Sequence, residues 1–172
     1  HCNYSLGFLA SGYDSSPSFG QSYHPAYYHD YFAKWIPVRL TSYWQEVDAL
    51  NTRWFDTVRR RNKADISFEY ADFSPAGRRE TMRRYTDLSN LIFTDHRYCF
   101  FREHGEDYEL FSSMFPLLRG ENMIFAVRGG MTVGFLFWYP DYNELVPPGA
   151  GAGISTFLRY KLLGRTPATI KV

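Results

Sequence analysis

The sequence is short of cysteine, of net charge and of long apolar runs, and each shortage excludes a class of protein. Its 172 residues include only Cys2 and Cys99, which are too few for a disulfide framework and fit a reducing compartment. The formal net charge of +1 lacks the basic footprint of nucleic-acid binders. The longest apolar run, Val133 to Tyr139, is far shorter than the roughly 20 residues that span a bilayer. We therefore expect a soluble, cytoplasmic protein that binds neither nucleic acid nor membrane.

The common catalytic and metal-binding patterns are also missing. The five histidines are scattered, and neither cysteine has a neighbour at the spacing of metal ligands. No Ser/His/Asp set and no Cys/His pair can be read from the spacings. We expect no metal ion.

Aromatic residues are abundant, at 19% of the chain with 14 Tyr and 15 Phe. They predict a core packed from large flat side chains or, as the alternative, an aromatic binding surface. The length allows one sizeable core or two incomplete ones. Because the sequence opens on His1 rather than on methionine, we expect it to be an excerpt of a longer chain.

The first third of the sequence is rich in turn-forming residues and predicts three elements. Pro25 suits the start of a helix whose aromatic stripe recurs at helical spacing. A strand is expected over Val38 to Trp44, and an amphipathic helix over Asp48 to Lys63. The stripe consists of Tyr28, Tyr31, Phe32 and Trp35.

The clearest strand of the sequence runs from Asp65 to Phe73. Its strict alternation predicts that Ile66, Phe68 and Tyr70 face the core. Ser74-Pro75 follows as a helix start, and the apolar spacing continues this helix to about Thr94.

The second half of the chain predicts a helix, a hairpin and a final short helix and strand. The second helix, around Tyr108 to Leu118, should end or kink just before Pro116. Gly129-Gly130 joins two apolar strands, Asn122 to Arg128 and Met131 to Tyr139, in a tight hairpin. A short helix from Ile154 to Leu163, closed by Gly164, precedes a strand that begins near Ala168.

Several stretches resemble one protein family. Met123 to Phe135 is similar to the second and third strands of the GNAT superfamily of acyl-CoA-dependent N-acyltransferases, with the frequent "VGF" at its end. Together with Tyr139 to Glu144, the sequence resembles a branch of uncharacterised bacterial proteins that carry two GNAT-like halves in tandem. Leu6 to Pro17 and Tyr23 to Tyr28 look like the close of the first half.

The resemblance implies an α+β fold with a mixed, largely antiparallel sheet that is flanked by helices and incomplete. It divides the chain into three parts. Residues 1–47 would close a first GNAT-like half, residues 48–63 would form a bridging helix, and residues 64–172 would open a second GNAT-like domain.

The implied activity is transfer of an acyl group from acetyl-CoA or another acyl-CoA to a small-molecule amine. Such enzymes hold the coenzyme pyrophosphate on a Gly-rich loop that enters a helix after the fourth strand. The nearest candidate, Gly149 to Gly153, precedes a short helix on the wrong side of that strand and favours a flexible connection. We therefore expect no cofactor-binding residue in this chain and no activity from it alone. The alternative is a non-catalytic GNAT-like ligand-binding or interaction module.

The resemblance also suggests where the chemistry would lie. The loop from Thr94 to His104 would contact the acceptor, and Arg97, Tyr98 and Phe100 are its candidate substrate-binding residues. His96 and His104 are weaker candidates for a base. The family's acidic Tyr would fall on Phe32, which leaves only the neighbouring Tyr28 and Tyr31 as catalytic candidates. The unpaired final strand at Ile170 further suggests self-association or a complementing half.

Overall fold

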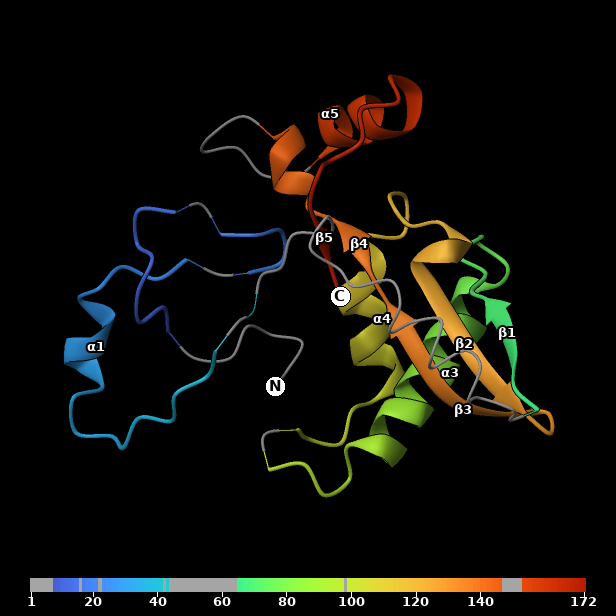
Figure 1. Cartoon of the computed structure of the whole chain (residues 1–172), viewed down its shortest axis with the longest axis horizontal. Coiled ribbons are helices and arrows are strands. Elements are labelled where there is room, and N and C mark those ends of the chain that lie inside the picture. The colour runs from blue at the N-terminus through green and yellow to red at the C-terminus, as the bar shows by residue number, and fades with distance from the viewer. Residues whose placement is uncertain are drawn as a thin grey trace, which may run out of the picture.

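The protein is of the mixed α+β class, with two small antiparallel sheets and several helices (Figure 1). Strands β1 (Ser67–Tyr70), β2 (Met123–Arg128) and β3 (Met131–Phe137) form one sheet in that order. Strands β4 (Tyr139–Pro140) and β5 (Ile170–Lys171) form the other. The computed structural model describes residues 8–15, 17–21, 23–41, 43, 65–97, 99–146 and 153–172.

The predicted hairpin is confirmed. Gly129 and Gly130 have φ angles of 55° and 78°, which residues with a Cβ adopt at a cost, and they turn β2 into β3. The register pairs Met123 with Phe137 and Arg128 with Met131, with an irregularity at Ala126/Val127. The alternation of β2 is regular, since its odd-numbered residues are buried.

Strand β1 forms as predicted, but its faces are the reverse of the prediction. Phe68 and Tyr70 are 72% and 71% exposed, whereas Ser67 and Glu69 lie on the face that the helices cover. The reason is that β1 is an edge strand. Its inward carboxylate at Glu69 reaches the margin of the helix layer, where Arg84 Nη1 neutralises it at 2.7 Å.

Helices α3 (Arg78–Ile92) and α4 (His104–Ser112) pack on one face of the three-stranded sheet. Ser74 prepares the start of α3, because its hydroxyl accepts a hydrogen bond from Gly77 N at 3.2 Å and its carbonyl accepts one from Arg78 N at 3.0 Å. The core between sheet and helices is aromatic, as predicted. It is built from Met82, Tyr85, Phe111, Phe115, Leu118, Met123 and Phe125, with Phe135 and Phe137 packed against it.

Helix α4 ends at Ser112, before Pro116, as the sequence predicts. The chain then turns through residues 113–117. This turn brings Phe115 into the core between sheet and helices and Leu117 into a second hydrophobic cluster. Pro116 has no backbone N–H and cannot donate the hydrogen bond to the carbonyl of Ser112 that would continue the helix. The helix therefore ends at Ser112.

A second, smaller core joins the C-terminal part to the N-terminal segment. Tyr142 and Tyr160 are buried in it, and Phe19 packs edge-on against Tyr142 at 5.1 Å. The predicted helix from Ile154 is present as α5 (Ile154–Phe157) followed by a π-helical turn (Leu158–Leu162). Gly164, with φ of 63°, closes it as predicted.

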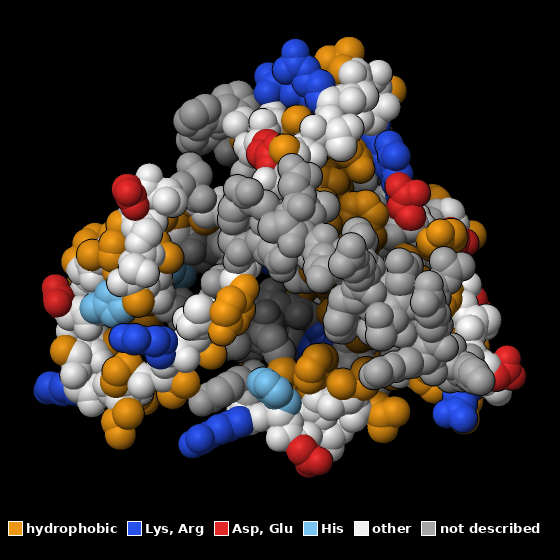
Figure 2. Space-filling model, viewed as in Figure 1, with side chains coloured by type: hydrophobic (Ala, Val, Ile, Leu, Met, Phe, Trp, Pro, Cys, Tyr) orange, Lys and Arg blue, Asp and Glu red, His pale blue; other side chains and the backbone are white. Residues whose placement is uncertain are grey.

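The N-terminal segment is less regular than predicted. The helix after Pro25 is only α1 (Tyr28–Tyr31), and its aromatic stripe is largely exposed. Figure 2 shows hydrophobic side chains gathered over this segment. The strand predicted from Val38 is wrong over residues 38–41, which make no ladder and lie exposed. The helix predicted over Asp48–Lys63, and both domain boundaries beside it, lie outside the described residues.

One glycine of the fold is set by close packing. A Cβ on Gly120 would lie 2.6 Å from the carbonyl oxygen of Ala71. The chain can relieve this clash only by moving backbone, so we expect Gly120→Ala to lower the free energy of unfolding by about 1–3 kcal/mol. Gly105, in α4, has nothing within 4 Å of such a Cβ. Gly105→Ala should therefore raise the free energy of unfolding by up to about 1 kcal/mol. Urea titration of both variants measures the two changes. An equal loss of unfolding free energy in Gly120→Ala and Gly105→Ala would contradict the prediction.

Candidate functional site

A cavity of about 610 Å³ opens between the end of α3, the loop after it and the start of α4. We name it the α3–α4 cavity. Its volume falls in the range of small-molecule sites. Most of its lining residues are polar or charged, and the loop that forms one wall is the segment expected to contact an acceptor. The lining consists of Asp87, Asn90, Leu91, Thr94, Phe101, Arg102, Glu103, His104 and Gly105.

Arg102 is the buried cation of the α3–α4 cavity, with only 6% of its surface exposed. Its Nη1 donates a hydrogen bond to the Tyr85 hydroxyl at 3.3 Å. The guanidinium carbon lies 4.8 Å from the centre of the Tyr85 ring, which adds a cation–π contact. Asp107 Oδ1 is 3.4 Å from the same Nη1. The charge of Arg102 is therefore held deep in the wall by one ring and one carboxylate.

Asp107 is a buried carboxylate that is only partly satisfied. It is 1% exposed, and its Oδ1 has no hydrogen-bond partner among the described atoms, although Arg102 is at ion-pair distance. Its Oδ2 lies 2.6 Å from Thr86 Oγ1, which also donates to Met82 O at 2.9 Å. A single hydroxyl proton cannot serve both acceptors fully. Burial raises the pKa of Asp107, and the Thr86 hydroxyl and Arg102 oppose that rise.

Asn90 fixes the loop to α3. Its Nδ2 donates to the backbone oxygen of Arg102 at 2.8 Å, and its Oδ1 accepts from the backbone N–H of Arg102 at 2.9 Å. This two-point clamp holds the Arg102 backbone in place relative to the helix. The position of the guanidinium is thus determined by α3 at two levels, through the backbone clamp and through Tyr85.

His104 and Asp87 form a pair at the edge of the α3–α4 cavity. His104 Nε2 lies 2.7 Å from Asp87 Oδ1, and both side chains are about half exposed. With Nε2–H donating to the carboxylate, the lone pair of the neutral ring is on Nδ1. Within the described chain no atom is paired with Nδ1. The cavity edge therefore carries an oriented imidazole with a free acceptor nitrogen.

A second cavity, of about 510 Å³, adjoins the first and shares Asp87 and Leu91 with it. Its cations are already paired with neighbouring carboxylates. Arg83 lies 2.7 Å from Glu80, and Arg84 lies 2.7 Å from Glu69. Exposed pairs of this kind are typical of a solvated helix face, so we place the candidate site in the α3–α4 cavity.

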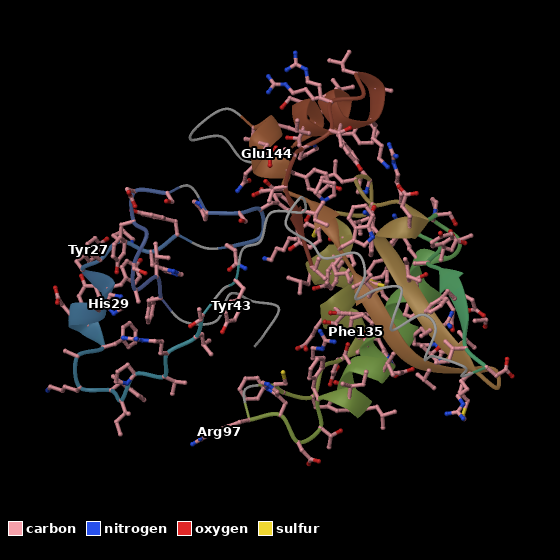
Figure 3. All side chains as sticks on the ribbon, in the orientation of Figure 1. Tyr27, His29, Tyr43, Arg97, Phe135 and Glu144 are labelled. Atoms are coloured by element: carbon pink, nitrogen blue, oxygen red, sulfur yellow. The ribbon has the colours of Figure 1, made fainter. Side chains whose placement is uncertain are left out.

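The structure describes two of the three predicted acceptor residues, and both lie outside the wall of the α3–α4 cavity. Arg97 is exposed and points away from α3 and α4 (Figure 3), and Phe100 is also exposed. Tyr98 lies outside the described residues. Neither Arg97 nor Phe100 lines either cavity. Their role in binding stays a prediction.

The predicted catalytic tyrosines lie on α1, apart from the α3–α4 cavity (Figure 1). Tyr28 is half-buried against Phe8, with ring centres 5.7 Å apart, and Tyr31 is exposed. The structure does not bring them together with His104 or Arg102.

Sequence reasoning missed Arg102, Asp107 and Asn90. Asp87 and Asn90 lie one turn apart on α3, and this spacing predicts that their side chains share one face of the helix. Arg102 carries no such signal, because its burial depends on an irregular loop. His104 was among the weaker candidates, and its pairing with Asp87 connects residues 17 positions apart.

The expectation that this chain holds no coenzyme stays a prediction. The helix after Gly153 consists of α5 and the π-helical turn that continues it. The remainder of the predicted Gly-rich segment, residues 149–152, lies outside the described residues. No group of three or more metal-ligating side chains is found in the part of the chain that the structure describes.

The fold and the cavity define a mixed α+β protein with a polar cavity between two helices that cover a small antiparallel sheet. No family model matches this sequence, and neither a curated protein nor a solved structure is significantly similar to it. Across the described ranges, none of the helices is both long and apolar enough to cross a membrane.

Proposed function

We propose that this chain forms the acceptor side of an acyl-CoA-dependent N-acyltransferase and binds a primary amine in the α3–α4 cavity. The observation that carries the proposal is the His104–Asp87 pair, 2.7 Å apart, at the edge of that cavity. The cavity lies at the loop between two helices, where the resemblance places an acceptor. The order of strand, two helices and hairpin supports the same assignment.

The chemistry required of the acceptor side is to bind an ammonium group and to remove one proton. Asp87 and Glu103 line the α3–α4 cavity and offer carboxylate oxygens to an ammonium. His104 Nδ1 accepts one proton from it, which leaves the free amine that N-acylation needs and an imidazolium. Asp87 then stabilises the imidazolium through its hydrogen bond to Nε2.

In this proposal the acyl-CoA is bound by residues other than the described ones, and no step of the transfer itself is assigned to this chain. The division of labour is testable, because it separates amine binding from coenzyme binding. The described chain should bind amines in the absence of acyl-CoA.

The proposal predicts that Asp87→Asn weakens the binding of a primary amine by about tenfold or more, because a charge-assisted hydrogen bond contributes about 1.5–3 kcal/mol. Glu109→Gln is the matched control. It also removes one exposed negative charge from this region, but Glu109 does not line the cavity. Isothermal titration with a panel of primary amines measures both. Equal affinity in wild type and Asp87→Asn, or no amine binding at all, would overturn the proposal.

A second candidate function is a non-catalytic interaction module. It is favoured by the sheet face opposite the helices, where Phe68 and Tyr70 on β1 and Leu136 on β3 are exposed on the two strands that flank β2. In this case a second copy of the chain would cover that face. Light scattering that shows a monomer over a range of concentrations would contradict it.

A further inference from the structure

The buried charge of Arg102 is only partly compensated by its neighbours. A guanidinium removed from water needs partners for its five N–H groups. Its described partners, the Tyr85 hydroxyl and the Asp107 carboxylate, both approach the same nitrogen, Nη1. Asp107 makes no hydrogen bond through the oxygen that faces it. The Tyr85 hydroxyl and the Asp107 carboxylate therefore stabilise the guanidinium through Nη1 alone.

The other edge of the guanidinium, formed by Nε and Nη2, is available for a ligand. Among the described residues no atom accepts a hydrogen bond from either nitrogen. Neither of them is among the fully buried unpartnered atoms, so both keep some access to solvent, and Arg102 is one of the residues that line the α3–α4 cavity. Two parallel N–H groups on one edge match the two oxygens of a carboxylate.

The remaining lining supplies the opposite charge. Asp87 and Glu103 are carboxylates of the same cavity, and His104 is oriented by Asp87. The cavity thus offers one buried cation with spare donors and two more exposed anions. A ligand that is complementary to both has a carboxylate and an ammonium in one small molecule.

We infer that the acceptor bound in the α3–α4 cavity is an amino acid or a related amino carboxylate, with its carboxylate on the Nε/Nη2 edge of Arg102 and its ammonium at Asp87 and Glu103. The inference rests on the proposed function and sharpens it. Arg102 is the specificity-determining residue, because an amine without a carboxylate leaves its spare donors without a partner. Sites built to pair a polar ligand group discriminate strongly against ligands that lack it.

The test uses matched ligands on the unaltered chain. Isothermal titration is run with the series of amino carboxylates from glycine to 6-aminohexanoate and with the carboxamide of each. Propionate, a carboxylate without an amine, is included. We expect at least one amino carboxylate to bind at least about tenfold more tightly than its carboxamide and more tightly than propionate.

Substitution of Arg102 tests the same inference by changing the protein instead of the ligand. Arg102→Lys keeps the positive charge but loses the two-donor edge, and it should reduce the preference for the amino carboxylate over its carboxamide by about tenfold. Arg128→Lys, at the exposed end of β2, is the control and should leave the preference unchanged. The preference is a ratio measured on folded protein, so a loss of stability in Arg102→Lys does not imitate it. An unfolded variant leaves the ligand series to decide.

The outcomes separate this inference from the proposed function. Tight binding of amino carboxylates alone supports both. Equal binding of amino carboxylates and their carboxamides overturns the inference and leaves the amine site standing. Binding of propionate as tight as that of the amino carboxylates overturns the amine site, and no binding of any ligand overturns both.

Discussion

Replacing Asp107 with alanine is expected to lower the free energy of unfolding by about 3–5 kcal/mol. The substitution leaves the guanidinium of Arg102 buried without its carboxylate, and breaking a buried ion pair from one side has a cost of this size. It also removes the oxygen that lies 2.6 Å from Thr86 Oγ1. Urea titration followed by circular dichroism measures the loss.

The matched variant is Asp107→Asn, which also removes the negative charge but keeps hydrogen-bonding groups in the same place and should therefore cost less. An amide nitrogen donates to Thr86 Oγ1, which then donates its proton to Met82 O, so the hydrogen bonds become compatible. A loss of less than about 1 kcal/mol in Asp107→Ala would contradict the buried pair.

The same residue predicts a pH dependence. Burial raises the pKa of Asp107 in the folded state above its ordinary value of 3.8, so the folded protein binds this proton more tightly than the unfolded chain does. The contribution of Asp107 to stability should therefore fall as pH rises from 3.8 through the raised pKa. Asp107→Asn has no such titration. The difference in free energy of unfolding between wild type and Asp107→Asn should shift in favour of the variant as pH increases.

Replacing Phe125 with alanine is expected to lower the free energy of unfolding by about 3–5 kcal/mol, as large-to-small changes in a packed core do. Phe125 is 1% exposed, and the guanidinium carbon of Arg84 lies 4.2 Å from its ring centre. The variant loses both the core packing of the Phe125 ring and its contact with the Arg84 guanidinium. Chemical unfolding of the purified protein measures the loss.

Phe68→Ala is the matched control for Phe125→Ala, because it removes the same side chain from the opposite face of the same sheet. Phe68 is 72% exposed, and its removal should change the free energy of unfolding by less than about 0.5 kcal/mol. A large loss in Phe68→Ala would mean that the sheet face carrying Phe68 is packed in solution, and it would contradict the assignment of faces to β1.

The elements that could be predicted from sequence are those fixed by local chemistry. Gly129-Gly130 admits the positive φ angles of a tight turn, and Pro116 prevents a helix that precedes it from continuing. The apolar spacing of α3 also requires a buried face, and Met82, Tyr85 and Leu88 lie on it. Each of these signals acts within a few residues.

The faces of β1 could not be predicted in this way, because alternation gives the period but not the direction. Phe68 and Tyr70 are more apolar than Ser67 and Glu69, yet they face outward. The deciding contact, from Arg84 to Glu69, crosses 15 residues. An edge strand beside a basic helix can therefore turn its polar side inward.

The candidate site depends on contacts of the same long range. Arg102 is buried by Tyr85, Asp107 and the Asn90 clamp, which come from both helices. The sequence indicates the loop, through its mixture of titratable and aromatic residues, but not which side chain turns inward. Among the described candidate residues of the loop, which are His96, Arg97, Phe100 and His104, only His104 lines the α3–α4 cavity.

The most direct test of the acceptor site is residue-resolved. Backbone amide NMR spectra recorded during titration with the amine that binds most tightly report which residues the ligand approaches. We predict that the shifts concentrate at Asn90, Arg102 and His104 and saturate together, with no change at Phe68 or Tyr70 on the opposite sheet face. Shifts centred on that sheet face or on α1, with none around the α3–α4 cavity, would contradict the assignment of this cavity as the amine site.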